Sequence, residues 1–313
     1  MMPPLRVAVI GVGHLGRHHA RLLAAIPGVE LSAVVDTNRA RADEIAAASG
    51  TRAHTDYRDV IGRVDAVTLA VPTELHGEVA LPFLEAGVAV LVEKPMARSV
   101  AEADELIAAA ARTGALLAVG HTERFNPAVL AARTRLADPR FIEVHRLGTF
   151  PERSLDIDVV FDLMIHDLDI VLSFVDSEVE SIEAVGVPVL TGRVDIANVR
   201  IRFVNGCIAN LTASRISRDR VRKIRFFQPE AYLSIDYAAQ KLEVWRLVTG
   251  NGPAPSIQGG EVPVQNQEPL KCELEDFVDA VVAGRRPLVP GEEGRRALAL
   301  ATQIAEAMAD SNG

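Results

Sequence analysis

The stretch Arg6-Val7-Ala8-Val9-Ile10-Gly11-Val12-Gly13-His14-Leu15-Gly16 decides the fold of this chain. The run before Gly11 is typical of a strand covered on both faces, and a helical stretch from about His14 to Ala25 follows it. Gly11 makes a tight turn, Gly13 lets a pyrophosphate approach the helix N-terminus, and Gly16 lets the helix pack against the strand. The stretch therefore predicts a dinucleotide site, with cofactor contacts from Gly11, Gly13, His14, Leu15 and Gly16.

An acidic residue follows at the spacing that dinucleotide-binding folds require. Asp36 stands twenty residues after Gly16, at the end of the second predicted strand. A carboxylate there accepts hydrogen bonds from a ribose diol and repels a 2′-phosphate, which favours NAD over NADP. Arg39 weakens this argument, because a nearby arginine can accommodate a 2′-phosphate. Arg39 is equally well explained as a solvated charge at the start of a helix.

Short apolar runs alternate with amphipathic stretches up to about residue 123, a pattern that predicts a doubly wound parallel sheet. The strands are expected at 6–10, 30–35, 66–70, 89–92 and 116–119. After about residue 140 the runs alternate in polarity, which is typical of a mostly antiparallel sheet covered on one face. The sequence thus predicts an α/β protein with a Rossmann domain at 1–123 and an α+β domain for substrate binding and oligomerisation at 124–313.

Two more polar segments follow strands of the first domain, where ligands bind in open α/β folds. Thr73 and His76 come after the third strand and are expected to line the cofactor crevice, although a solvated surface histidine is an equally good interpretation. Glu93 and Lys94 come after the fourth and are also expected to contact the cofactor, and Pro95 stops the ladder there. An ammonium at Lys94 could stabilise alkoxide character on a reacting oxygen. The alternative is an ordinary surface lysine.

A second informative stretch runs from Asp162 to Asp169 inside a segment that is apolar almost all round, which predicts a buried helix. At about 100° per residue, Asp162, His166 and Asp169 fall within roughly 60° of arc. A carboxylate beside an imidazole fixes its tautomer and stabilises its protonated form, as a general base requires. The alternative is a core histidine flanked by structural aspartates. No further ligands accompany the pair, so no metal site is expected.

The composition of the chain argues against several classes of protein. The 313 residues carry a formal charge of −9, which disfavours a nucleic-acid partner. Cys207 and Cys272 are too few for a disulfide framework, and the start of the chain lacks the features of a signal peptide. No apolar run reaches about 18 residues, so no membrane span is expected. These features together favour a cytoplasmic protein.

The predicted strands of the second domain lie at 141–148, 179–189, 197–203, 207–214, 221–228, 231–235 and 241–247, with a loop at 250–260 and helices near 268–283 and 292–308. One face of this sheet is expected to be left uncovered, and burying its apolar content would require another subunit. The sequence therefore predicts a homodimer or homotetramer formed through this sheet. Its candidate apolar residues are Ile201, Phe203, Ile208, Leu211, Ile224 and Phe226.

Three motifs in this order, Gly11-x-Gly13-x-x-Gly16, Glu93-Lys94-Pro95 and Asp162-x-x-x-His166, resemble the glucose-fructose oxidoreductase and inositol dehydrogenase family, called Gfo/Idh/MocA. The resemblance covers essentially the whole chain. It implies that Lys94, Asp162 and His166 surround the substrate carbon that faces the nicotinamide, as catalytic and substrate-binding residues.

A narrower resemblance involves residues 119–127 and 158–169, which are similar to family members that oxidise the 3-hydroxyl of UDP-N-acetylglucosamine. It implies that His121, Arg124 and Asn126 lie near nicotinamide and substrate, with Arg124 on the cofactor and the other two on the substrate. The alternative is a domain junction packed by Phe125 and turned by Asn126.

A nucleotide-sugar carries a diphosphate, and arginine forks bind phosphate oxygens in pairs. Arg146, Arg153 and Arg215 are the expected substrate-binding cations, while the basic run from Arg218 to Arg225 is typical of a solvated face.

The sequence therefore predicts an NAD-dependent dehydrogenase acting on a secondary hydroxyl of a sugar, C3 of a UDP-N-acetyl-hexosamine. Two alternatives stay open: an inositol or free-sugar dehydrogenase with the same residues, and an NAD-binding sensor without turnover.

Overall fold

The computed structural model describes residues 3–150, 157–249 and 255–311 of the chain. They form two compact units. The first contains residues up to Thr122 and returns for Glu268–Leu298, and the second contains Glu123–Gln267 and the residues from Ala299 onward. The division of function at residue 123 stays a prediction. The units differ from that simple division because the segment 268–298 belongs with the amino-terminal residues.

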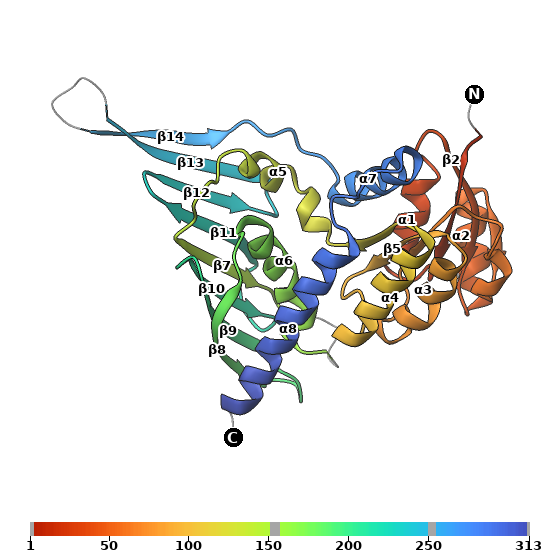
Figure 1. Cartoon of the computed structure of the whole chain (residues 1–313), viewed down its shortest axis with the longest axis horizontal. Coiled ribbons are helices and arrows are strands. Elements are labelled where there is room, and N and C mark those ends of the chain that lie inside the picture. The colour runs from red at the N-terminus through yellow and green to blue at the C-terminus, as the bar shows by residue number, and fades with distance from the viewer. Residues whose placement is uncertain (1–2, 151–156, 250–254, 312–313) are drawn as a thin grey trace. The chain divides into compact units, whose positions relative to one another are not determined.

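The first unit contains a six-stranded sheet in the order β3-β2-β1-β4-β5-β6, with every neighbouring pair parallel. This is the strand order of a doubly wound dinucleotide-binding fold, as the sequence predicts. Strands β2 and β5 of this sheet are labelled in Figure 1. The short edge strand β3 was not predicted, because three residues are too few to show a period. The strands are β1 (Leu5–Ile10), β2 (Val29–Val35), β3 (Arg52–His54), β4 (Ala66–Leu69), β5 (Ala89–Glu93) and β6 (Leu117–Gly120).

Helices of the first unit begin and end at residues suited to those positions. Asn38 caps α2 and Ser99 caps α4 by accepting backbone hydrogen bonds, while Gly50 and Gly114 end these helices in the left-handed conformation. The helical elements are α1 (Gly16–Leu23), α2 (Arg39–Ser49), η1 (Tyr57–Val60), η2 (Thr73–Leu75), α3 (His76–Glu85), α4 (Val100–Thr113) and α7 (Pro269–Ala283).

Helix α7 completes the core of the first unit although it comes almost 150 residues after β6. Leu274 and Phe277 are 0% and 1% exposed and belong to one apolar cluster with Val7, Val9 and Leu23. Burial of these side chains therefore explains why the segment 268–298 belongs to this unit.

The second unit contains an eight-stranded sheet in the order β14-β13-β12-β11-β7-β10-β9-β8. Only β7 and β10 pair in parallel, and every other pair is antiparallel. The loop predicted at 250–260 is wrong over its second half, where β14 pairs with β13 despite Gly259 and Gly260. The strands are β7 (Phe141–Leu147), β8 (Val179–Val187), β9 (Ile196–Phe203), β10 (Ile208–Ser214), β11 (Val221–Gln228), β12 (Ala231–Asp236), β13 (Lys241–Val248) and β14 (Ser256–Val262).

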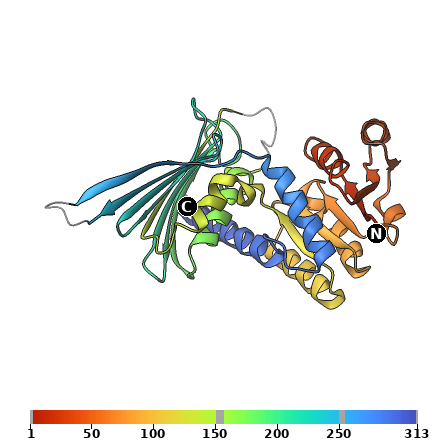
Figure 2. The same ribbon diagram turned by 90° about the horizontal axis from the view of Figure 1, so that it is seen from above.

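Helices lie on one side of this sheet only (Figure 2). Five of the six residues predicted for the uncovered face are 0–1% exposed on the covered face: Ile201, Phe203, Leu211, Ile224 and Phe226. That assignment is wrong because the period-2 register places these side chains under the helices. The helical elements are η3 (Thr122–Phe125), α5 (Pro127–Arg133), the π-helical turn η4 (Val160–Met164), α6 (Ile165–Phe174) and α8 (Gly291–Ser311), which belongs to this unit from Ala299 onward.

Within the described ranges, no helix combines the length and the apolar composition that crossing a bilayer requires.

Candidate active site

The predicted cofactor segments of the first unit all lie at the carboxyl edge of its sheet. The glycine-rich turn follows β1, Asp36 follows β2, Thr73 follows β4, Lys94 follows β5 and His121 follows β6. Because all six strands are parallel, their carboxyl ends meet at one edge. The sequence prediction that these segments gather at this edge is confirmed.

Two glycines of the turn are required by the packing of the backbone around them. Gly11 has a φ of +83°, and a Cβ there would lie 2.7 Å from the carbonyl oxygen of Ala70. A Cβ on Gly16 would lie 1.8 Å from the carbonyl oxygen of Gly11. Gly13 differs, because its Cβ would meet nothing within 4 Å and would project into open space. No side chain caps the N-terminus of α1, so this open space suits a pyrophosphate.

Asp36 is 8% exposed and is connected to the glycine-rich turn. Its carboxylate accepts hydrogen bonds from the backbone N–H of Val12 (3.1 Å) and of Asn38 (2.9 Å). The arginine beside it is Arg41, whose Nη1 lies 3.3 Å and 3.5 Å from the two carboxylate oxygens. Arg39 instead pairs with Asp43 on the exposed face of α2. The arginine close to Asp36 is therefore Arg41 and not Arg39, because the Asn38 cap determines which residue of the first turn faces Asp36.

His76 is 1% exposed, so the structure corrects the prediction that it lines the crevice. Its Nδ1 lies 2.9 Å from the carbonyl oxygen of Pro95, and its Nε2 lies 3.0 Å from that of Val71. Burial lowers the pKa of His76, although both carbonyls act in the opposite direction. A neutral ring has one N–H, so His76 donates to one of these carbonyls and contacts the other, which connects the loop after β4 to the loop after β5.

The last residue of β5 and the residue that follows it lie in different surroundings. Glu93 is 7% exposed, with Oε1 3.1 Å from Nε2 of the buried His19. A Cβ on Gly120 would lie 2.8 Å from Glu93 Oε1, so a glycine at that position leaves room for the carboxylate. Glu93 therefore contacts its own unit rather than presenting its carboxylate as the predicted cofactor ligand. Lys94 is partly exposed immediately after the strand and precedes a cis peptide bond to Pro95.

In the second unit, the helix predicted around Asp162 and His166 is buried as expected. Met164, Ile165 and Leu168 are 0% exposed, while Asp162 and His166 keep part of their surface accessible. The segment is not one regular α-helix, because Asp162 lies in the π-helical turn η4 and His166 in the first turn of α6. Such turns are frequent at functional sites and are not visible in a hydrophobic pattern.

The arginines predicted to bind a diphosphate have carboxylate partners within the chain. Arg146 is 3% exposed and binds Asp167 and Glu123. Arg215 is 1% exposed and binds Asp195 at 3.0 Å. These contacts correct the expectation that both guanidinium groups face a substrate. Arg153 lies outside the described residues.

The junction residues are also buried. Arg124 Nη1 lies 3.3 Å from Asp169 Oδ1, and Asn126 donates to the carbonyl oxygen of Tyr237 (3.0 Å) while capping α5 through Ala128 N–H. His121 is 1% exposed. The contacts of Arg124 and Asn126 lie within the second unit, and their expected contacts with nicotinamide and substrate stay predictions.

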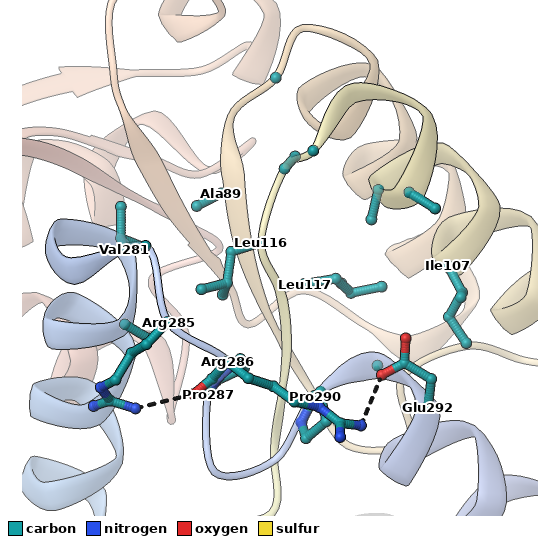
Figure 3. Close-up of a pocket in the computed structure, with 18 of the residues that line it drawn as sticks. Ala89, Ile107, Leu116, Leu117, Val281, Arg285, Arg286, Pro287, Pro290 and Glu292 are labelled. Atoms are coloured by element: carbon teal, nitrogen blue, oxygen red, sulfur yellow. Dashed lines mark hydrogen bonds and ion pairs between the residues drawn. The ribbon is translucent and has the colours of Figure 1, made fainter.

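A cavity of about 520 Å³ in the first unit lies away from these segments. Ala89 and Leu117, which begin β5 and β6, line it, so it lies at the amino edge of the sheet (Figure 3). Its two arginines have partners, since Arg285 binds Asp276 at 2.7 Å and Arg286 lies 3.4 Å from Glu292. The cavity therefore does not belong to the dinucleotide site.

Among the described residues, no group of three or more histidine, cysteine or acidic side chains is arranged to hold a metal ion.

Comparison with known proteins identifies relatives of both units. Residues 5–121 match the family model of an oxidoreductase family with an NAD-binding Rossmann fold, and residues 128–233 match the GFO/IDH/MocA C-terminal domain. The chain is 40% identical over 302 residues to UDP-N-acetylglucosamine 3-dehydrogenase from Acidithiobacillus ferrooxidans, which covers 96% of each chain. The solved structure of that enzyme matches with a TM-score of 0.92 over 98% of each chain.

Two further relatives have other substrates in their names. The scyllo-inositol 2-dehydrogenase (NAD(+)) of Bacillus subtilis is 30% identical over 232 residues, 68% of each chain. Levoglucosan dehydrogenase, solved in complex with NADH and levoglucosan, has a TM-score of 0.89 over 98% of each chain at 20% identity, which shows the fold alone.

Proposed function

This chain belongs to the Gfo/Idh/MocA family of NAD-binding oxidoreductases, and from that premise we propose that it oxidises C3 of a UDP-N-acetyl-hexosamine. The sequence predictions of the family, of oxidoreductase activity and of NAD as cofactor are confirmed. The observation that carries the proposed substrate is the 40% identity to UDP-N-acetylglucosamine 3-dehydrogenase, which extends over 96% of both chains.

The proposed chemistry uses one residue of the first unit and two of the second. His166 removes the proton of the substrate hydroxyl, and Asp162 orients the imidazole and stabilises its protonated form. Lys94 donates a hydrogen bond to the same oxygen and stabilises its developing negative charge. Bound nicotinamide accepts hydride from the substrate carbon. This assignment is supported by the position of Lys94 at a strand end and by the accessible surface that Asp162 and His166 keep on a buried helix.

For NAD, we propose that the backbone from Gly11 to Gly16 holds the pyrophosphate and that Asp36 holds the ribose diol. The open space at Gly13 and the uncapped N-terminus of α1 support the first contact. Thr73, His14 and Leu15 lie at the same edge of the sheet and complete this set. Arg124 stays a proposed cofactor contact and His121 a proposed substrate contact, both shortly after β6.

Turnover of a substrate panel tests the proposal. Purified protein is incubated with NAD and UDP-N-acetylglucosamine, UDP-N-acetylgalactosamine, UDP-glucose, inositols or free aldoses, and reduced cofactor is followed at about 340 nm. We expect the highest kcat/KM with a UDP-N-acetyl-hexosamine and loss of activity in Lys94→Ala and His166→Ala. If the protein oxidised free sugars but no UDP-sugar, the proposed substrate class would be rejected.

Inositol oxidation is the second candidate, because the 30% identity to scyllo-inositol 2-dehydrogenase favours it. An uncharged polyol needs no phosphate-binding cations, whereas a UDP-sugar does. Inhibition of the enzyme by free UDP would therefore favour the nucleotide-sugar, and indifference to UDP would favour the polyol.

We further propose a homodimer or homotetramer formed through the uncovered face of the second sheet, in the cytoplasm. A row of aromatic residues on this face supports the assembly. Ring centroids of Phe141 and Phe227 are 5.5 Å apart, those of Phe227 and Tyr232 are 5.1 Å apart, and Trp245 lies opposite Tyr232 in the register. Phe227 and Trp245 are 36% and 40% exposed, which is typical of a surface that a partner covers. The cytoplasmic proposal is supported by two cysteines that form no disulfide in the structure.

A further inference from the structure

The helix that carries His166 is fastened through the next residue of the chain. Asp167 is 1% exposed, whereas His166 keeps accessible surface. Successive residues of a helix project about 100° apart, so these two side chains point in different directions. Holding the Asp167 carboxylate therefore fixes the rotation of α6 about its axis. That rotation sets the direction in which the His166 imidazole projects.

Arg146 of β7 holds that carboxylate with both arms of its guanidinium. Its Nε lies 2.5 Å from Asp167 Oδ2, and its Nη2 lies 3.1 Å from Asp167 Oδ1. This paired geometry restrains angle as well as distance, which a lysine could not do. Strand β7 lies in the interior of the sheet between β11 and β10, so the anchor point is rigid.

The same guanidinium also holds the start of the second unit. Nη1 and Nη2 of Arg146 both lie 3.3 Å from Glu123 Oε1, and the ring of Tyr237 lies 5.3 Å from the guanidinium carbon. Burial lowers the pKa of Arg146, but Asp167 and Glu123 outweigh it and raise the pKa above its ordinary value, so the side chain stays charged.

A second ion pair fastens α6 from another side. Arg124, the neighbour of Glu123, places Nη1 3.3 Å from Asp169 Oδ1. Asp169 is two residues after Asp167, roughly 200° further around the helix. The adjacent residues Glu123 and Arg124 are thus linked to α6 through two separate guanidinium contacts.

We propose that Arg146 is a positioning residue that orients His166 by fixing Asp167, without contacting substrate or NAD. The proposal rests on the proposed role of His166 in proton transfer. Buried ion pairs add little net stability compared with apolar residues of the same volume, but they select one arrangement of the groups around them in some proteins. Removing the pair should therefore affect turnover more than folding.

The test changes the ion pair between Arg146 and Asp167 in two ways. Arg146→Lys keeps the charge and loses the paired geometry, whereas the double variant Arg146→Met with Asp167→Leu removes both charges of the pair and leaves Glu123 partly exposed, with Asn126 Nδ2 at 3.4 Å. The matched control is Arg295→Met with Asp104→Leu, which removes a pair of the same geometry, at 2.8 Å and 3.1 Å, between α8 and α4. Melting temperature and NAD dissociation constant are measured for each protein.

We expect kcat to fall about 100-fold in the Arg146 double variant and about 10-fold in Arg146→Lys. The NAD dissociation constant should stay within about two-fold, because Arg146 lies in the other unit. The control should keep its kcat. A folded double variant with the kcat of the unmodified protein would overturn the proposal.

A second readout does not depend on turnover. Diethyl pyrocarbonate modification of His166 is measured by peptide mass spectrometry, with His54 of the first unit as internal reference. We expect the rate at His166 to change at least about three-fold in the Arg146 double variant and to stay constant in the control. If no sugar is oxidised by the unmodified protein, the proposed function fails, and this rate alone decides whether Arg146 orients His166.

Discussion

Single residues at the carboxyl edge of the first sheet have separable tasks. Gly11 and Gly16 are needed by the fold, because a side chain at either would collide with backbone. Gly13 is not required by packing within the protein, because a side chain there would meet only open space, and we propose that it is required by the cofactor pyrophosphate. Asp36 accepts two backbone hydrogen bonds within the first unit, and we propose that it also binds a ribose.

Gly13→Ala should therefore separate cofactor binding from folding. We expect an unchanged melting temperature and an NAD dissociation constant at least about ten-fold higher, a loss of about 1.4 kcal/mol. Gly16→Ala should instead destabilise the protein by about 3 kcal/mol, because a Cβ 1.8 Å from Gly11 O forces the backbone to move. Calorimetry and NAD fluorescence titration measure both effects. Equal destabilisation by the two substitutions would contradict this division.

Asp36→Ser should shift preference toward NADP. The substitution removes the charge that repels a 2′-phosphate and leaves Arg41, now 3.3 Å from the carboxylate, near the position of that phosphate. We expect the ratio of kcat/KM for NAD to that for NADP to fall at least about ten-fold. Asp43→Ser, which removes the exposed partner of Arg39, is the control and should leave the ratio unchanged.

At the scale of elements, the hydrophobic pattern predicted most strands and the buried helix, but not the π-helical turn or β14. A pattern reports which side chains are apolar, and neither a locally widened helix nor a glycine-rich edge strand has a distinct apolar signature. The connections between elements depend on buried polar side chains, of which His76 is the clearest example because it joins the loops after β4 and β5.

His76→Phe keeps an aromatic ring at this position but removes the one N–H that the neutral imidazole donates to the carbonyl of Pro95 or Val71, so we expect the free energy of unfolding to fall by about 1–3 kcal/mol. Because burial lowers the pKa of His76 from 6.5, the unfolded chain takes up a proton first as pH falls. The contribution of His76 is therefore complete above pH 6.5 and is lost as the pH falls below it. Melting temperatures at pH 7.5 and 5.5 should differ more for the unmodified protein than for His76→Phe. His54→Phe, which replaces a partly exposed histidine, is the control. If both substitutions changed the pH dependence of the melting temperature equally, the role assigned to His76 would be rejected.

At the scale of the whole molecule, each compact unit is assembled from two separate stretches of chain. The two faces of the second sheet also differ in burial. Its covered face holds the buried apolar residues of β9, β10 and β11, among them Phe203 and Phe226, and its uncovered face holds the partly exposed aromatic row from Phe141 to Trp245.

The double substitution Phe227→Glu with Trp245→Glu should dissociate the proposed oligomer, because burying two carboxylates at an interface is strongly unfavourable. We expect light scattering to give a dimer or tetramer for the unmodified protein and a monomer for the variant. Val282→Glu, at a 53% exposed position on α7, should have no effect. A monomeric mass for the unmodified protein at every concentration would exclude the assembly.

The sequence by itself determined the parallel sheet, the dinucleotide turn, Asp36 and the family. Glycine spacing after a strand and a buried helix with polar residues depend on local backbone geometry, which neighbouring residues encode. Only the tertiary structure decided the partners of buried charges. The sequence alone predicts that Arg146, Arg215 and His76 bind a ligand. In the folded chain, Arg146 pairs with Asp167, Arg215 pairs with Asp195, and His76 contacts two loop carbonyls. A charged side chain in a dry interior requires a partner, and only the folded chain determines which residue supplies it.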